Sequence, residues 1–81
     1  MLAKVYVTPK KAILDPQGKA IVHSLHALDY TEVIDARMGK YLEVRLMGLS
    51  RTEAEQRVDE MCRRLLANLV IEDFRFEIVE E

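Results

Sequence analysis

The sequence predicts an α+β fold in which one antiparallel sheet carries two helices on one face. Apolar and polar residues alternate in short runs near both ends of the chain and in its middle, and this period of two is typical of strands with one buried face. Two further segments begin with helix-capping residues and continue with apolar residues at helical spacing. The segments follow in the order βαββαβ, which predicts a ferredoxin-like sandwich.

The N-terminal third contains the first strand and the first helix. Alternation from Ala3 to Thr8 predicts a strand that ends near Pro9. Asp15 and Pro16 then begin a helix, because an aspartate side chain accepts from free backbone N–H groups and a proline in the first turn loses no hydrogen bond. The apolar residues expected to face the core from this helix are Ile21, Leu25 and Leu28.

The middle of the chain predicts a hairpin. Val33–Met38 and Tyr41–Met47 are strand-like runs, and Gly39 with Lys40 separates them. Glycine can supply the positive φ of a tight hairpin turn. In the second run the residues expected to share the core face are Leu42, Val44 and Leu46.

The second helix and the last strand complete the pattern. Ser50 and Glu53 have the spacing of a capping box, in which each side chain satisfies a free backbone donor at the helix start. The apolar stripe expected behind this box comprises Ala54, Val58, Met61, Cys62 and Leu65. Alternation in Asp73–Ile78 then predicts the last strand, whose core face carries the residues Phe74, Phe76 and Ile78.

Length and composition describe one small domain, residues 1–81. A chain of 81 residues has no room for a second core, and its single cysteine allows no intrachain disulfide, so self-association is the expected source of further stability. The net charge of −2 argues against general nucleic-acid binding. We see neither a signal-peptide pattern nor the run of about 20 apolar residues that a membrane span needs, so we expect a cytoplasmic protein.

Few residues suggest chemistry. His23 and His26 have a spacing used by metal sites, but no acidic or cysteine partner lies at ligand spacing, so a solvated or subunit-facing role is favoured. Cys62 lies on an apolar stripe and is expected to be buried. We find no catalytic triad, carboxylate pair or phosphate-binding loop, so we expect no catalytic residue, metal or cofactor in this chain.

One cluster suits an interface. Arg37, Gly39, Lys40 and Tyr41 would combine a projecting turn with the cationic and aromatic side chains that are enriched at protein contacts, although a solvated turn explains the same residues. The residues themselves therefore predict a non-catalytic interaction module.

Several segments in order resemble one family. They are Lys4–Thr8, Leu14–Ala20, Arg37–Tyr41, Met61–Asn68 and Val70–Phe74. Together they look like PurS, the small subunit of phosphoribosylformylglycinamidine synthase, over essentially the whole chain. Leu69 stands where such sequences often carry a proline.

The resemblance implies a purine-biosynthesis enzyme divided over three chains. A large synthetase subunit, PurL-like, uses ATP and Mg²⁺ to form the amidine, and a glutaminase subunit, PurQ-like, releases ammonia from glutamine. The PurS-like chain holds neither active site, bridges the other two, supports ammonia transfer and is a homodimer or tetramer when free. We expect its partner contacts at Arg37, Gly39, Lys40 and Tyr41, with the helix face of His23 and His26 as a second choice.

Two other functions stay open on the same fold. A small-molecule-sensing regulatory domain would use the Asp15–Gly18 loop at a dimer interface. An RNA-binding module needs basic and aromatic residues on the open sheet face, where only Tyr6 and Tyr41 supply aromatic rings. An acylphosphatase-like enzyme is less favoured than either, because no glycine-rich loop carries an arginine.

Overall fold

The computed structural model describes all 81 residues as an α+β structure with three strands and two helices. The elements are β1 (Leu2–Pro9), α1 (Pro16–Ala27), β2 (Lys40–Arg45), α2 (Arg51–Met61), the π-helical turn η1 (Cys62–Leu66) and β3 (Glu72–Val79). The predicted α+β, ferredoxin-like class is confirmed, with the order βαβαβ in place of βαββαβ.

The sheet has β1 at its centre. Its strand order is β2-β1-β3, and both outer strands run antiparallel to β1. Val5 lies opposite Leu42 on one side and Phe76 on the other, so apolar residues of all three strands share one face. The polar residues between them, among them Tyr6 and Tyr41, share the other face.

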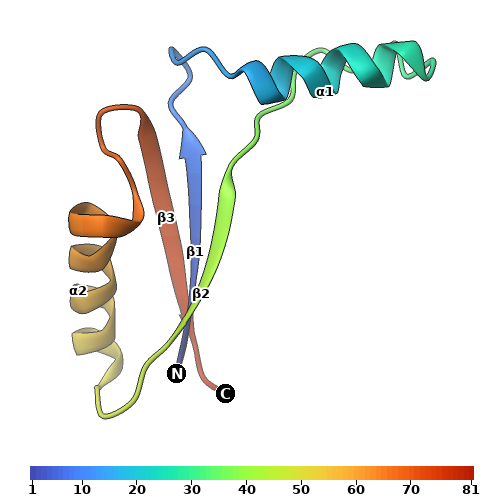
Figure 1. Ribbon diagram of the computed structural model, residues 1–81. Helices are drawn as coiled ribbons and strands as arrows, with labels where there is room; N and C mark the ends of the chain where they lie inside the picture. The colour runs from blue at the N-terminus through green and yellow to red at the C-terminus, as the bar shows by residue number, and fades with distance from the viewer.

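Helix α2 covers part of the apolar face (Figure 1). The residues that close the core are fully buried, and they are Ala3, Val5, Val7, Ala54, Val58 and Cys62. The capping box is confirmed: the Ser50 hydroxyl accepts from the Glu53 N–H at 3.2 Å, and the Glu53 carboxylate accepts from the Ser50 N–H at 3.1 Å. These bonds to Ser50 also lower the pKa of Glu53.

The π-helical turn changes which residues reach the core. It adds one residue to the last turn after α2, closed by the bond from the Ala67 N–H to the Cys62 carbonyl at 3.0 Å. The apolar stripe therefore continues through Leu66 and Ala67 rather than Leu65, which is 82% exposed. The expectation that Leu65 joins the core is wrong for this reason.

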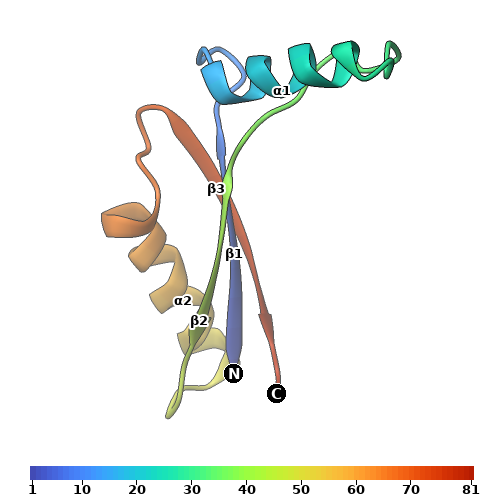
Figure 2. The ribbon, with the colours of Figure 1, turned by 45° about the vertical axis from the view of Figure 1, so that its right-hand side comes forward.

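Helix α1 does not cover the sheet. Figures 1 and 2 show it beyond the end of the strands, lying across their direction. Ile21 and Leu25 are therefore absent from the core, and Leu28 is 67% exposed. The radius of gyration is 16.1 Å, against about 12 Å for a compact domain of this length. The expectation that both helices pack on one face is wrong within a single chain.

The hairpin is also absent. Residues 33–38 form no strand, and the segment instead returns from α1, where the Val33 carbonyl lies 2.7 Å from Nε2 of His26. Gly39 has no positive φ. A Cβ there would lie 2.4 Å from the Val7 carbonyl oxygen, so glycine is needed because the start of β2 approaches β1 closely.

Candidate functional site

The junction between the sheet and α1 is built around Arg37. Its Nη2 donates to the carbonyls of Lys10 at 2.7 Å and Ile13 at 3.2 Å, and its Nη1 donates to that of Lys11 at 3.4 Å. The guanidinium thus ties the loop before α1 to the segment that follows it. The sequence predicts Arg37 as a partner contact, but its guanidinium donates its hydrogen bonds to backbone carbonyls of its own chain.

Asp15 completes this junction. Its carboxylate accepts from the Gly18 N–H at 3.0 Å and from the Met38 N–H at 2.8 Å, and Arg37 lies 3.9 Å away. The Met38 bond and then the Gly18 bond hold the pKa of Asp15 below its ordinary value. Asp15 and Pro16 therefore begin α1 as predicted.

The backbone is closely packed at this junction. A Cβ on Gly18 would lie 2.1 Å from the carbonyl oxygen of Ala36. We call Asp15, Gly18, Ala36, Arg37 and Met38 the elbow, because together they fix the direction in which α1 leaves the sheet. The sequence predicts the cap, but it carries no signal for the long-range bonds of Asp15 and Arg37.

The predicted cluster Arg37–Tyr41 does not form one surface. Arg37 belongs to the elbow, and Gly39 lies against Val7. Lys40 and Tyr41 are neighbours in β2, so they point to opposite faces of the sheet. Of the predicted group, Lys40 and Tyr41 are exposed with side chains free of the elbow.

Tyr41 belongs to a charged aromatic cluster on the helix-free face of the sheet. We call its members the tyrosine face: Tyr6, Tyr41, Glu43, Arg75 and Glu77. The tyrosine rings lie 5.1 Å apart, and the Arg75 guanidinium lies 3.9 Å over the Tyr6 ring. The hydroxyls donate to Glu77 at 3.2 Å and to Glu43 at 2.9 Å. Tyrosine and arginine are the side chains most often found in strong interface contacts.

The surroundings of Tyr41 on this face shift its pKa. Desolvation, then the hydrogen bond to Glu43, raises the pKa of Tyr41 to about 12. Neither Arg75 nor Glu77 is predicted from the sequence as a site residue, although the alternation in the last strand places both on this face.

Much apolar surface is left uncovered. The large exposed residues on α1 and its flanking loops are Leu14, Leu28, Ile34 and Met38. On the sheet, the β2 residues Leu42, Val44 and Leu46 are only half-buried, because no helix of the chain lies over them. A second apolar group, with Leu65 and Val70 more than 80% exposed, surrounds the turn before β3.

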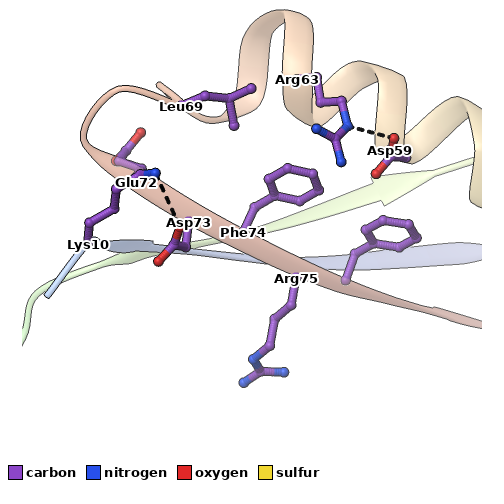
Figure 3. A pocket seen from close by; sticks show the side chains of 9 residues that line it. Lys10, Asp59, Arg63, Leu69, Glu72, Asp73, Phe74 and Arg75 are labelled. Atoms are coloured by element: carbon purple, nitrogen blue, oxygen red, sulfur yellow. Dashed lines mark hydrogen bonds and ion pairs between the residues drawn. The ribbon is translucent and has the colours of Figure 1, made fainter.

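A groove of about 670 Å³ lies between α2 and β3 (Figure 3). Phe74 and Phe76 form its floor, with ring centroids 6.5 Å apart. Arg63, paired with Asp59 at 2.8 Å, places its guanidinium 5.4 Å over the Phe74 ring. The groove thus has an apolar floor and a charged rim.

The remaining candidates are the helix histidines and the cysteine. His23 is exposed, and no group of three or more His, Cys, Asp or Glu side chains gathers in the chain. Cys62 is fully buried, and desolvation raises the pKa of its thiol. No helix has the length and apolar character needed to cross a membrane.

The fold and these surfaces define a small α+β protein that exposes many large apolar residues. Comparison with known proteins makes the assignment particular. The model of the family described as "PurS: Phosphoribosylformylglycinamidine (FGAM) synthase" matches residues 2–80. The chain therefore belongs to the PurS family.

Similar proteins agree along the whole chain. Phosphoribosylformylglycinamidine synthase subunit PurS of Bacillus subtilis is 51% identical over 77 residues, which are 95% of this chain and 90% of that protein. The B. subtilis PurS crystal structure matches with a TM-score of 0.85 at 49% identity, covering 98% of both chains. A chain in the structure of PurLQS from Thermotoga maritima matches with a TM-score of 0.83 at 25% identity, covering 98% of this chain and 99% of that one.

Proposed function

We propose that this chain is the non-catalytic small subunit of a three-chain phosphoribosylformylglycinamidine synthase in purine biosynthesis. It holds a PurL-like synthetase subunit and a PurQ-like glutaminase subunit together. Membership of the PurS family carries this proposal, and the similarity to a chain of the T. maritima PurLQS structure supports it. ATP and Mg²⁺ act in the synthetase subunit, and this chain supplies no cofactor site.

The contribution of the chain is geometric. Ammonia released by a free glutaminase is diluted and protonated by water, whereas a glutaminase held against the synthetase delivers it at a high effective concentration. A rigid subunit that binds both the glutaminase and the synthetase provides this high effective concentration, and it needs no reacting group of its own. The cytoplasmic location expected from the sequence stays a prediction.

A homo-oligomer is part of this proposal. The accessible surface is 6083 Å², about 1,100 Å² more than a folded chain of this mass exposes on average. A standard interface buries about 800 Å² of each partner. The excess therefore matches one protein contact, and the uncovered strand β2 and the unpacked helix α1 are its two halves. We propose that α1 of each copy covers β2 of the other.

Contacts with the two large subunits fall on the remaining polar surfaces. Lys40 and Tyr41 stay in this prediction with the tyrosine face, and so do His23 and His26 on α1. Gly39 and Arg37 act on the shape of the chain rather than through direct contacts. Gly39 lets β2 approach β1, and Arg37 holds α1 in its direction. The alternative of a small-molecule sensor loses support, because both oxygens of Asp15 are already bonded within the elbow.

Reconstitution tests the assembly role. The three purified chains are mixed with glutamine, ATP, Mg²⁺ and the formylglycinamide substrate, and amidine formation is measured with and without this chain. Omission should abolish the glutamine-dependent reaction, while ammonia supplied at high concentration still supports the synthetase. Full glutamine-dependent turnover without this chain would contradict the proposal.

A matched pair of variants locates the contact. Tyr41→Ala should weaken capture of the glutaminase or the synthetase in a pull-down, because it removes an exposed aromatic group from the helix-free face. Thr52→Ala, at an exposed position of α2, serves as the control and should leave capture unchanged. Equal capture by both variants would remove the tyrosine face from the proposal and leave the assembly role intact.

A further inference from the structure

Strand β3 is an unprotected edge of the sheet. Natural edge strands are kept from pairing with other chains by proline, lysine, bulges or short length. β3 has eight residues, none of which is a proline, lysine or glycine, and its register with β1 is continuous from Glu72 to Val79. The opposite edge, β2, has six residues and begins with Lys40. The longer and more regular edge is therefore open to an added strand.

The hydrogen-bond pattern shows which backbone groups of β3 face outward. The Lys10 N–H donates to the Ile71 carbonyl at 2.9 Å, so this pair, one step beyond β3, is hydrogen-bonded. Hydrogen-bonded pairs alternate with non-hydrogen-bonded pairs along an antiparallel ladder. Odd-numbered residues of β3 therefore turn their N–H and C=O groups to β1, and even-numbered residues turn theirs outward.

Two bonds within the chain mark the ends of the open part of this edge. The Arg51 guanidinium donates to the Ile78 carbonyl at 2.8 Å, which agrees with the pattern because β1 leaves that carbonyl free. At the other end, the Glu72 N–H donates to the Asn68 carbonyl at 2.7 Å within the preceding turn. The outward groups between these bonds belong to Phe74 and Phe76. An extended chain offers donors and acceptors at the spacing that such groups require.

The groove of about 670 Å³ between α2 and β3 has room for side chains of an added strand. Figure 3 shows Phe74 and Arg75 pointing to opposite sides of β3, with Phe74 on the side of Arg63 and Asp59. Because side chains alternate along a strand, every second side chain of an added strand would lie over the floor made by Phe74 and Phe76. Arg63 already pairs with Asp59 at 2.8 Å, so the groove favours apolar side chains at these positions.

The charge of β3 distinguishes between possible segments. The strand carries three acidic residues, Glu72, Asp73 and Glu77, and one basic residue, Arg75, which lies 3.9 Å over the Tyr6 ring of its own chain. A basic segment would meet opposite charge at this edge, whereas a second copy of β3 would bring a strand of the same negative charge. The charge therefore favours a basic segment of a different protein.

We propose that β3 receives an extended, basic segment of a partner protein as a fourth strand of the sheet. Apolar residues at alternate positions of that segment lie in the groove under α2, and the basic residues between them face Asp73 and Glu77. Backbone bonds then give affinity, and the alternate side chains give specificity. The inference rests on the proposed function for the identity of the partner, which is one of the two large subunits, and it adds the β3 edge to the contact surfaces described above.

A proline at position 74 tests the backbone bonds. The Phe74 N–H points outward, so Phe74→Pro removes no bond to β1, and edge strands tolerate proline at such positions. Phe74→Ala is the matched control, because it also loses the ring but keeps the N–H. Binding of each purified large subunit is measured on the immobilised wild type and on both variants. One of the two subunits should bind Phe74→Pro at least about tenfold more weakly than Phe74→Ala.

A peptide tests the chemistry of the segment without either large subunit. The probe is a short capped peptide in which lysine and valine alternate. One control peptide has the same composition in separate blocks, and another has glutamate in place of lysine. In an NMR titration the alternating lysine peptide should shift the amide signals of Phe74 and Phe76, and both controls should bind at least about tenfold more weakly.

A matched pair of charge variants tests the preference for a basic segment. Asp73→Asn should weaken binding of the alternating lysine peptide about two- to fivefold, because it removes a negative charge beside the added strand. Glu32→Gln removes one negative charge at an exposed position beyond α1 and should leave the binding unchanged.

The outcomes separate this contact from the proposed function. Weaker binding of one subunit by Phe74→Pro than by Phe74→Ala, together with the peptide preference, supports the edge contact even if reconstitution shows full turnover without this chain. Equal binding of both subunits by the two variants overturns it, even if omission of the chain abolishes turnover. A lower mass in solution for Phe74→Pro than for Phe74→Ala would assign the edge to a second copy and also overturn it.

The peptide decides the question if Phe74→Pro does not fold, which circular dichroism would show. Equal binding of the alternating and the block lysine peptides by the wild type would overturn the proposal, because a strand at this edge requires the alternation. Equal binding of the lysine and glutamate peptides would overturn the basic character of the segment.

Discussion

The two ends of the molecule use the same kinds of side chain in opposite ways. At one end, α2 presses small residues, Ala54 and Val58, onto the sheet and buries them completely. At the other end, α1 carries an apolar stripe of similar spacing that meets no sheet (Figure 2). The difference does not lie in the stripes themselves. It lies in the connections, because the elbow fixes α1 away from the sheet, whereas Gly48, with φ of 77°, turns the chain back so that α2 lies over it.

An amphipathic stripe indicates which face of a helix becomes buried. It does not indicate whether the residues that cover this face belong to the same chain or to another one. A stripe covered within the chain stabilises the monomer, and a stripe left uncovered stores that free energy for association. Variants at the two ends should therefore differ in kind: changes under α2 unfold the chain, and changes on α1 alter its assembly.

The largest effect is expected at Val58. It is fully buried, so Val58→Asp places a charge without a partner in the core and should destabilise the chain by at least about 4 kcal/mol, enough to unfold it. Circular dichroism during thermal melting measures this. Gln56→Asp, at an exposed position of the same helix, should melt close to the wild type. A folded Val58→Asp variant would contradict the placement of the core under α2.

Leu25 tests the uncovered stripe. Leu25→Glu lies outside the core, so the sheet and α2 should stay folded while the mass in solution falls, because a charge on the stripe opposes its burial in a second copy. Light scattering at micromolar concentration gives the mass. Lys19→Glu, on the other side of α1, is the control. A monomeric wild type would defeat the idea that α1 packs on another chain.

The sequence predicts the local features of this structure better than it predicts the path of α1. Short-range signals predict the structure correctly at the cap of Asp15, at the capping box of Ser50 and in the strands β1, β2 and β3, because each of these features depends on residues within one element. The path of α1 depends instead on bonds that join Asp15 to Met38 and Arg37 to Lys10, more than 20 residues apart. Hydrophobic periodicity carries no information about such bonds, so the sequence wrongly predicts that this helix packs on the sheet.

The site residues show the same contrast between local and long-range signals. The sequence predicts Tyr41 as a site residue because aromatic residues beside cations suit interfaces. Arg75 and Glu77 come from the far end of the chain and reach the same face only through the pairing of β1 with β2 and β3. The sequence predicts a surface role for Arg37, because its three backbone acceptors lie more than 20 residues away and no local pattern reveals them. The expected hairpin strand at 33–38 failed for a similar reason, since that segment packs along α1.

A smaller effect is expected at Arg37 than at Val58. Arg37→Ala removes three hydrogen bonds to backbone carbonyls and should lower the free energy of unfolding by about 1–3 kcal/mol, with some loss of oligomer because α1 loses its fixed direction. Arg45→Ala is the control, since Arg45 pairs only with Glu81 at the exposed end of the sheet. Equal melting temperatures for both variants would show that the elbow holds without its guanidinium.

The smallest effect is a dependence on pH that comes from Asp15. Its pKa is lowered in the folded chain, chiefly by the Met38 N–H and then by the Gly18 N–H, so the folded state favours the ionised carboxylate more than the unfolded state does. The sign follows from linkage: the stabilisation is fully present above the unfolded pKa of about 3.9 and is lost as the pH falls through the lower folded value. Asp15→Asn keeps a capping oxygen but carries no charge.

We therefore expect the wild type to be more stable than Asp15→Asn at pH 7, and the difference to shrink as the pH falls from about 5 to 3. Urea unfolding at each pH measures it. Asp35→Asn, in the same segment, is the control, because Asp35 is exposed and lies outside the elbow. A difference between the wild type and Asp15→Asn that is the same at pH 3 and pH 7 would mean that the elbow recognises the shape of the Asp15 side chain and not its charge.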